Sequence, residues 1–391
     1  MNMVEWKKLG DICDFLKGRS LSKNDIGLGE SQVILYGELY TTYGDYITSI
    51  RSKTSSEIAA EATKLEFDDL VLPVSSTTKE AQIGKVSVIK EKADISLGSD
   101  AIILRNSFNS NFLMYYLNST LFEREKMNCV HGTTIMHLSP KELAQKTVPI
   151  PSVSEQQRIV DILDTFTSTI ENLKQQIALR RKQYEYYRDK LLDLEGKEGV
   201  VMKTLGDIMQ IVRGASPRPI QNYITREDDG VNWIKIGDVS PNDKYITKTN
   251  EKITREGANK SRILHPGAFI LSNSMSFGRP YILQIDGCIH DGWIAMSEYE
   301  KYVSSGYLYE ILNADTIQRY WNKKANNGGA MTNLNSDIVR ETPIPIPSSS
   351  EQQRIVYILD TFEVSIANLE AQLAQREKQY EYYRNKLLTF E

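Results

Sequence analysis

Apolar residues recur at helical spacing in two long stretches of the chain. From residue 163 to 194, and again from 359 to 390, they alternate at intervals of three and four residues. A period of 3.5 residues over about four heptads predicts a coiled-coil seam on each stretch. The seams consist of Leu163, Phe166, Ile170, Leu173, Ile177, Tyr184, Tyr187, Leu191 and Leu194, and of Leu359, Phe362, Ile366, Leu369, Leu373, Tyr380, Tyr383, Leu387 and Phe390. One arginine interrupts each seam, Arg180 in the first and Arg376 in the second.

Each helix is expected to begin after a proline-closed entry, PIPSVSEQQ from Pro149 and PIPSSSEQQ from Pro345. The serines of these entries are N-cap candidates, followed by a glutamate at the positive end of the helix. A helix of roughly 40 residues is about 60 Å long. Because the first helix leads from one half of the chain to the other, we expect the seams to pair antiparallel within one chain. Two alternatives stay open: each helix packs on its own domain, or the seams pair between chains, so that the isolated chain self-associates.

The whole chain is a repeat with a period of 196 residues. Residues 155–192 align without a gap to residues 351–388, with 27 identities in 38 positions. The same offset pairs Leu9-Gly10-Asp11-Ile12 with Leu205-Gly206-Asp207-Ile208, and it pairs Leu138 with Leu334. One offset that holds from start to end of each half indicates that a whole unit was duplicated. We therefore expect domains at 1–151 and 197–347, a central helix at 152–196 and a second helix at 348–391.

The two domains are expected to be α+β, with short strands, many turns and a pseudo-twofold relation through the repeat. Strands are predicted at 83–89, 268–272 and 281–285, and helices near 112–127 and 306–324. Between the conserved anchors, residues 20–127 and 216–323 share little sequence. Near-identical helices with divergent domains are typical of one scaffold that carries two different specificities.

Composition describes an ordinary globular protein: 391 residues, 40% of them hydrophobic and 25% charged. No run of eighteen apolar residues and no secretory signal is present, and the three cysteines lie far apart, so we expect free thiols in a reducing cytoplasm. The net charge is −4, and neither domain is broadly basic: residues 1–150 carry 17 basic and 19 acidic groups, and residues 197–346 carry 18 and 17. If the chain binds DNA, the positive charge for that contact must therefore come from a local patch of basic residues.

Each domain contains three polar, glycine-bearing segments that suit contacts with DNA. They are the turns near Gly18 and Gly214, the loops 74–85 and 272–279, and the segments 131–137 and 326–333. Glycine permits close backbone approach, and the polar side chains can donate to phosphates and base edges. The candidate DNA-binding residues are Lys17, Arg19, Thr77, Lys79, Lys85, His131, Thr133, Thr134, Arg213, Ser216, Arg218, Asn273, Ser274, Arg279, Asn327 and Asn333. The same composition is also typical of solvated surface turns. His131 and His137 lack carboxylate or cysteine partners at metal-binding spacing, so a structural or DNA-facing role is expected for them.

Sequence signatures of catalysis are missing. The chain has no phosphate-binding G-x-x-x-x-G-K-[ST] loop, no glycine fingerprint of a dinucleotide site, no local signature of a Ser-His-Asp or Cys-His arrangement, and no Asn/Asp-Pro-Pro-aromatic motif of an amino-methyltransferase. This pattern indicates a binding protein without catalytic residues, cofactor or metal. Two other hypotheses are a coiled-coil scaffold whose domains bind proteins or peptides, and an enzyme that acts alone.

The layout resembles the specificity (S) subunit of type I restriction–modification systems. The resemblance rests on P-I-P-x-x-x-x-E-Q-Q-R-I at Pro149 and Pro345, and on RGASP, VNWIKIGD, SRILHPGAFILSNSMSFGR and GGAMTNLN in the second half; the first half matches less closely, with KGRS at its first turn. It implies two target recognition domains that each read one half of a gapped, asymmetric site in double-stranded DNA, with the helices setting the spacing. It also implies two methyltransferase (M) subunits and ATP-driven restriction (R) subunits as partners, which would bind S-adenosylmethionine and ATP. The expected docking residues for these partners are Gln156, Arg158, Gln352, Arg354, Tyr186 and Tyr382.

Overall fold

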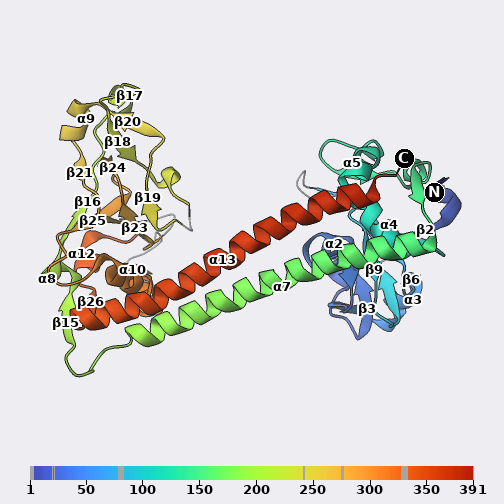
Figure 1. The fold of residues 1–391 in the computed structure, drawn as a ribbon, viewed down its shortest axis with the longest axis horizontal. Coiled ribbons are helices and arrows are strands. Elements are labelled where there is room, and N and C mark those ends of the chain that lie inside the picture. Colours follow the sequence, from blue (N-terminus) through green and yellow to red (C-terminus); the bar gives the residue numbers. More distant parts are fainter. Residues whose placement is uncertain are drawn as a thin grey trace. The chain divides into compact units, whose positions relative to one another are not determined.

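The computed structural model divides the chain into two compact units. It describes residues 4–19, 21, 23–77, 83–240, 243–273, 277–326 and 333–390. Unit 1 comprises Met1–Lys174 with Ala371–Glu391, and unit 2 comprises Gln175–Glu370. The two long helices, α7 (Val153–Leu192) and α13 (Ser349–Leu388), each begin in one unit and end in the other (Figure 1). Outside these helices, each unit forms an α+β domain, called head 1 in unit 1 and head 2 in unit 2.

Head 1 is built around two sheets. The first has the order β2 (Cys13–Lys17), β11 (Ala101–Asn106), β7 (Leu70–Pro73), β9 (Ser87–Ile89) and β4 (Tyr46–Ile47). The second has the order β5 (Ser52–Thr54), β3 (Ser31–Ile34), β10 (Ile95–Leu97) and β6 (Thr63–Leu65). Small sheets add β1 (Glu5–Lys8) with β14 (Thr147–Ile150), and β12 (Val130–His131) with β13 (Met136–Leu138) and β8 (Ser75–Ser76).

Head 2 has the corresponding pair of sheets. The first has the order β16 (Gln210–Arg213), β25 (Trp293–Ser297), β22 (Phe269–Ser272), β23 (Pro280–Leu283) and β19 (Tyr245–Ile246). The second has the order β17 (Ile224–Thr225), β20 (Glu251–Ile253), β18 (Val231–Ile234), β24 (Gly287–Ile289) and β21 (Arg262–Leu264). A further pair joins β15 (Val201–Thr204) to β26 (Pro343–Ile346).

The two heads share one topology although their sequences diverge. In both first sheets every neighbouring pair is antiparallel except the last, β9 with β4 and β23 with β19, which is parallel. In both second sheets the one parallel pair is the corresponding central one, β3 with β10 and β18 with β24. Head 2 differs by the added edge strand β17. The duplicated α+β fold expected from the repeat is therefore confirmed.

The helices of the heads cover these sheets. The predicted helix near 112–127 is two helices, α4 (Ser110–Leu117) and α5 (Thr120–Met127), because the side chain of Ser119 accepts a hydrogen bond from the Phe122 amide and starts a second helix. Its counterpart near 306–324 is likewise split, into α10 (Ser305–Asn313) and α11 (Asp315–Asn326). The short helices are α1 (Leu9–Ile12), α2 (Tyr36–Thr41), α3 (Ser56–Glu61), α6 (Pro140–Leu143), α8 (Leu205–Ile208), α9 (Arg255–Asn259) and α12 (Ser336–Arg340).

In each unit the long helices complete a hydrophobic core. Ile159, Val160 and Leu163 of α7 are buried with the core of head 1, and Ile355 and Leu359 of α13 with that of head 2. A separate core fills the space between the two sheets of each head. The three cysteines are buried free thiols, as expected. In the part of the chain that the structure describes, no helix combines the length and apolar character of a membrane span.

The predicted antiparallel pairing of the helices is confirmed inside each unit. In unit 1 Phe166 of α7 stacks on Tyr383 of α13 at 5.5 Å between ring centroids, and Lys174 pairs with Glu377, so rising numbers on one helix meet falling numbers on the other. In unit 2 Tyr187 stacks on Phe362 at 5.5 Å and Arg181 pairs with Glu370.

The arginines that interrupt the seams have an explanation in this packing. The guanidinium of Arg376 lies 5.7 Å from the centre of the Phe166 ring, and that of Arg180 lies 5.8 Å from the Phe362 ring. A guanidinium over an aromatic face is an attractive contact, so the seam continues through the arginine without an apolar side chain.

Candidate nucleic-acid interface

Backbone hydrogen bonds bring distant polar segments together at one edge of head 1. The Gly18 amide donates to the Ala101 carbonyl (2.9 Å), and the Val74 amide donates to the Asp100 carbonyl (2.8 Å). The Leu138 amide in turn donates to the Val74 carbonyl (2.8 Å). These bonds join the turn after β2, the loop after β7, the loop between β10 and β11, and strand β13. We call this region, residues 17–19, 74–77, 98–100 and 130–138, the polar edge of head 1.

Head 2 has the same frame of hydrogen bonds with different side chains. The Gly214 amide donates to the Trp293 carbonyl (2.8 Å), the Asn273 amide to the Gly292 carbonyl (3.1 Å), and the Leu334 amide to the Asn273 carbonyl (2.9 Å). Residues 213–218, 272–273, 290–292 and 333–334 therefore form the polar edge of head 2. The described parts of the three segments singled out in the sequence reach these edges at Gly18, Val74 and 131–137 in head 1 and at Gly214, Asn273 and Asn333 in head 2, where they meet a fourth segment that sequence reasoning missed, 98–100 and 290–292.

The glycine at the first turn is required by this frame. A Cβ added at Gly18 would lie 1.9 Å from the Gly98 carbonyl oxygen, and one at Gly214 would lie 2.0 Å from the His290 carbonyl oxygen. Neither distance is compatible with a side chain, so only glycine lets the turn approach the loop. This explains why the two halves share glycine here while the residues around it differ.

Most of the candidate residues of head 1 that the structure describes belong to its polar edge. Lys17, Arg19, Thr77, Thr133 and Thr134 are exposed there, and His131 Nε2 lies 2.8 Å from Glu142 Oε2.

Lys85 is separated from this group. Its half-buried side chain donates to the Tyr43 carbonyl (3.0 Å), where its charge acts on Asp45. Burial raises the pKa of Asp45, and Lys85 and Arg384 oppose this effect. Lys79 lies outside the described residues.

In head 2 four candidate residues converge on Asp291, which sequence reasoning did not single out. Its carboxylate accepts hydrogen bonds from Ser216 Oγ (2.9 Å, at Oδ1) and Arg218 Nη2 (3.2 Å, at Oδ2). Its carbonyl accepts from Arg213 Nε (3.0 Å) and Asn273 Nδ2 (3.2 Å). The hydrogen bond from Ser216 is the largest of the effects that lower the pKa of the Asp291 carboxyl. The Asp-Gly dipeptide between two apolar strands, a turn signal, is the feature that could have drawn attention to this loop.

The remaining candidates of head 2 are more dispersed. Arg279 is half-buried beside Tyr281, and Asn333 is exposed at the polar edge. Ser274 and Asn327 lie outside the described residues. His290 precedes Asp291, and burial lowers the pKa of its imidazole. The ring accepts a hydrogen bond from the Gly292 amide at Nδ1 (2.7 Å), which closes the turn around Asp291.

Two of the expected docking residues are buried inside their own unit. Gln156 is 2% exposed and donates to the Pro151 carbonyl (2.8 Å). Gln352 is 4% exposed, donates to the Tyr302 carbonyl (3.0 Å) and accepts from the Ser304 amide (2.9 Å). These side chains close the helix entry, so neither of them is presented at the surface of its unit. Arg158 and Arg354 are exposed, and Tyr186 and Tyr382 are each 60% exposed.

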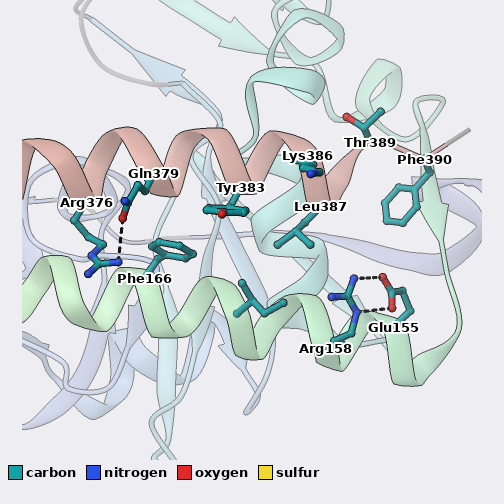
Figure 2. A pocket seen from close by; sticks show the side chains of 11 residues that line it. Glu155, Arg158, Phe166, Arg376, Gln379, Tyr383, Lys386, Leu387, Thr389 and Phe390 are labelled. Atoms are coloured by element: carbon teal, nitrogen blue, oxygen red, sulfur yellow. Dashed lines mark hydrogen bonds and ion pairs between the residues drawn. The ribbon is translucent and has the colours of Figure 1, made fainter.

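A groove between the helices of unit 1 has a counterpart in the sequence of unit 2. The groove has a volume of about 810 Å³, and Figure 2 shows Phe166 facing Tyr383 across it, with Arg158 bound to Glu155 and Arg376 to Gln379. Nine of its eleven lining residues are identical at the 196-residue offset, with the two helices exchanging roles. The equivalent pairs in unit 2, Arg354 with Glu351 (2.7 Å) and Arg180 with Gln183 (3.1 Å), are also formed.

Each head is joined to the helices by its own set of polar contacts. In unit 1 the hydroxyls of Tyr46 and Tyr115 donate to Asp164 of α7 at 2.5 Å and 2.6 Å. In unit 2 the hydroxyl of Tyr184 donates to Glu310 of α10 at 2.7 Å, and Lys244 pairs with Glu363 of α13 at 3.0 Å. Burial raises the pKa of Glu310 to about 7. The helices therefore accept two different heads through different residues.

Taken together, the fold and the edge define a class: a duplicated α+β binding protein that presents two different polar edges on one scaffold. A family model described as the type I restriction modification DNA specificity domain matches residues 3–180 and 197–377. The chain belongs to this family, as its resemblance to S subunits predicted.

Relatives with known names or structures agree with this assignment. The chain is 32% identical over 269 residues to the type I restriction enzyme EcoR124I/EcoR124II specificity subunit of Escherichia coli, covering 63% of this chain and 64% of that protein. It is similar in fold to the type I restriction–modification S subunit from M. genitalium, with a TM-score of 0.56 at 15% identity, covering 100% of this chain and 97% of the other. A chain in a solved structure on complex assembly and conformational transition of the type I R-M system gives a TM-score of 0.66 at 16% identity, covering 98% and 97%.

Proposed function

We propose that this chain is the sequence-specific DNA-binding subunit of a type I restriction–modification complex. Each head reads one half of a gapped, asymmetric site in double-stranded DNA, and the helices set the spacing between the halves. The observation that carries the proposal is the polar edge: one backbone frame in both heads, carrying Lys17, Arg19 and threonines in head 1 but Arg213, Arg218 and Asn273 in head 2. A shared frame with different hydrogen-bonding side chains is what reading two different sequences requires.

The edge has the chemistry that major-groove recognition uses. Arginine pairs with guanine O6 and N7, asparagine pairs with adenine N6 and N7, and lysine and threonine contact phosphates. Asp291 gives Ser216 and Arg218 a common partner before DNA arrives, which favours one orientation of these side chains and lowers the entropy lost on binding. The small number of cations at each edge agrees with the nearly neutral heads, and other subunits of the complex would supply further phosphate contacts.

The near-identical helices are the proposed docking surface for two copies of one partner, the M subunit. Nine of eleven residues in the groove of unit 1 recur at the equivalent positions, so each copy would meet the same side chains. Of the expected docking residues, Arg158, Arg354, Tyr186 and Tyr382 are exposed on these helices. The chain itself performs no reaction in this proposal, and the R subunits join the complex for cleavage.

Mapping of methylated bases tests the proposal. Cells that carry this chain with its M subunit are expected to methylate adenine at one gapped, non-palindromic motif, read by long-read sequencing. A salt-dependent gel shift with the purified complex should show preference for that motif. Methylation only at ungapped palindromes, or a complex without any preference among DNA sequences, would contradict the proposal and favour a scaffold with protein or peptide ligands.

A further inference from the structure

Three side chains form a row across the small sheet at the polar edge of head 1. His137 of β13 is the backbone partner of Ser75 in β8 on one side and of His131 in β12 on the other. Residues that face each other across antiparallel strands project to the same side of the sheet. The row therefore runs from Ser75, which is 6% exposed, to the two exposed histidines.

The hydrogen bonds of Ser75 determine which nitrogen of His137 carries a proton. Ser75 Oγ lies 2.8 Å from Asp100 Oδ1 and 3.0 Å from His137 Nδ1. A carboxylate only accepts hydrogen bonds, and a serine hydroxyl has one hydrogen, so that hydrogen goes to Asp100. Ser75 Oγ must then accept from His137, which requires the proton to be on Nδ1. In the neutral ring, the lone pair is therefore on Nε2.

The groups that hold the ring are fixed by the frame of the edge. The Asp100 carbonyl accepts from the Val74 amide (2.8 Å), and the Ser75 carbonyl accepts from the hydroxyl of Tyr40 (3.0 Å). Asp100 adopts a left-handed backbone conformation with φ of 61°. Ser75, which contacts the ring, and Asp100, which contacts Ser75, are thus held by tertiary contacts before any ligand binds.

The two histidines of the row differ in what their Nε2 atoms contact. His131 Nε2 is 2.8 Å from Glu142 Oε2. The described residues provide no hydrogen bond to His137 Nε2, and the side chain is exposed. Of these two Nε2 atoms, that of His137 is therefore the one that can accept a hydrogen bond from a ligand, because His131 Nε2 donates to the Glu142 carboxylate. At the repeat offset its counterpart is Asn333, which is also exposed at the edge of head 2.

We propose that His137 is a base-reading residue of head 1 that accepts, through Nε2, a hydrogen bond from the exocyclic amino group of a base in the major groove. This inference rests on the proposed function. Adenine N6 and cytosine N4 are the amino donors in that groove, whereas guanine O6 and thymine O4 are acceptors and oppose the Nε2 lone pair. His137 thus selects adenine or cytosine at one position of the half-site, and Asp100 and Ser75 are its positioning residues.

The first test needs no DNA and examines the proton directly. The chain has four histidines, so selective ¹⁵N-histidine labelling of the full chain gives a simple long-range ¹⁵N–¹H spectrum. At pH 8 the His137 ring is expected in the Nδ1–H form, and Ser75→Ala is expected to convert it toward the Nε2–H form or a mixture. The His131 signals should not respond and serve as the internal control. An Nε2–H ring in the unaltered protein would overturn the inference.

The second test uses the complex with its M subunit and the motif found by methylation mapping. Each adenine in turn is replaced by the unsubstituted base purine, and each cytosine by 2-pyrimidinone. Each replacement removes one exocyclic amino group. Replacement at one position in the half-site of head 1 should lower the affinity of the complex for the DNA roughly tenfold, as expected for the loss of one hydrogen bond. For the His137→Ala variant, the replacement at that position should no longer change the affinity. The His137→Lys variant should prefer guanine or thymine at that position.

The matched variant separates the two proposals. Asn333→Ala should leave the His137 position unchanged and alter only the half-site of head 2, whereas the His137 variants should leave the half-site of head 2 unchanged. The unaltered half-site shows in each case that the variant folds. The unaltered complex could prefer its motif while His137→Ala abolishes the effect of no amino-group replacement. That result would overturn the role of His137 and leave the proposed function intact. Loss of all sequence preference in the unaltered complex would instead overturn the proposed function.

Discussion

Single acidic residues organise the polar edge of each head. In head 1 Asp100 acts through Ser75 on His137, and in head 2 Asp291 binds Ser216 and Arg218 directly. Both aspartates lie in the loop that joins corresponding strands of the two heads, β10 to β11 and β24 to β25. An acidic group cannot itself attract phosphate, so its value at a DNA-binding edge lies in orienting the donors and acceptors around it.

Removal of Asp291 should weaken sequence selection more than affinity. In Asp291→Ala the side chains of Ser216 and Arg218 lose their common partner and become mobile, so discrimination within the half-site of head 2 should fall roughly tenfold. Binding to unrelated DNA should stay the same or strengthen, because one negative charge is lost. Competition gel shifts with the complex measure both quantities.

Asp286→Ala is the matched control for this experiment. Its carboxylate contacts His265 at 2.6 Å, and neither residue belongs to the polar edge. The control should bind and discriminate like the unaltered protein. Equal losses in both half-sites after Asp291→Ala would contradict the assignment of Asp291 to head 2 alone.

At the scale of elements, the same helical surface accepts two different heads. Asp164 of α7 receives two tyrosine hydroxyls from head 1, whereas its counterpart Asp360 of α13 lies 3.9 Å from Lys244 of head 2. Tyr184 reaches Glu310, and its counterpart Tyr380 lies near Asp45 and Arg384. One of these junctions places Glu310 in the interior, where its charge is sensitive to pH.

Glu310 should make the stability of unit 2 depend on pH. Its side chain is 1% exposed, Oε1 has no hydrogen-bond partner among the described groups, and burial raises its pKa from 4.5 to about 7. Glu363 adds to this rise, whereas Tyr184, Lys244 and Arg188 oppose it. Between pH 4.5 and 7 the unfolded chain loses this proton while the folded chain keeps it. The contribution of Glu310 to the free energy of unfolding should therefore fall as pH rises through this window, by up to about 3 kcal/mol, and change no further above it.

Glu310→Gln should remove this part of the pH dependence and stabilise unit 2 at pH 8. Urea denaturation followed by tryptophan fluorescence measures the effect, because Trp233, Trp293 and Trp321 all belong to unit 2. Glu198→Gln, which changes an exposed carboxylate of the same unit, is the control and should keep the original profile. A Glu310→Gln variant with an unchanged profile would show that Glu310 does not titrate in this range.

At the scale of the whole molecule, the chain combines a repeated scaffold with two unlike heads. The two main sheets of each head correspond in strand order and sense apart from the added edge strand β17, and the helices share 27 of 38 residues, yet the side chains at the polar edges differ. Replacement of one head should therefore change one half of the recognised motif and leave the other half and the gap intact.

The contacts of Asp164 decide how such a replacement should be made. Tyr46 and Tyr115 both lie within residues 20–127, so a foreign segment without them leaves the half-buried Asp164 carboxylate without these donors. A chimera that keeps both tyrosines should be more stable than one that lacks them, by about 1–3 kcal/mol in denaturant unfolding. Methylation mapping of the stable chimera reads the motif, and a change in both halves would contradict the modular arrangement.

The sequence alone determined the duplication, the two long helices and their antiparallel pairing. A seam is encoded by residues three and four positions apart, and a gapless repeat keeps its offset along the whole chain, so both are visible without coordinates. The glycine of the first turn was visible as well, because the repeat offset pairs Gly18 with Gly214. The position of the helix break at Ser119 was not, because it depends on one cap, in which the Ser119 side chain accepts a hydrogen bond from the Phe122 amide.

Only the tertiary structure decided what forms the polar edge. Val74 meets Asp100, and Ser216 meets Asp291, across separations of 26 and 75 residues, through backbone geometry that no local pattern encodes. The same geometry placed Gln156 inside its unit and moved Lys85 away from the edge. Periodic spacing records which face of a helix is buried, whereas a binding edge depends on which distant strands lie side by side, and the packing of the two sheets sets that arrangement.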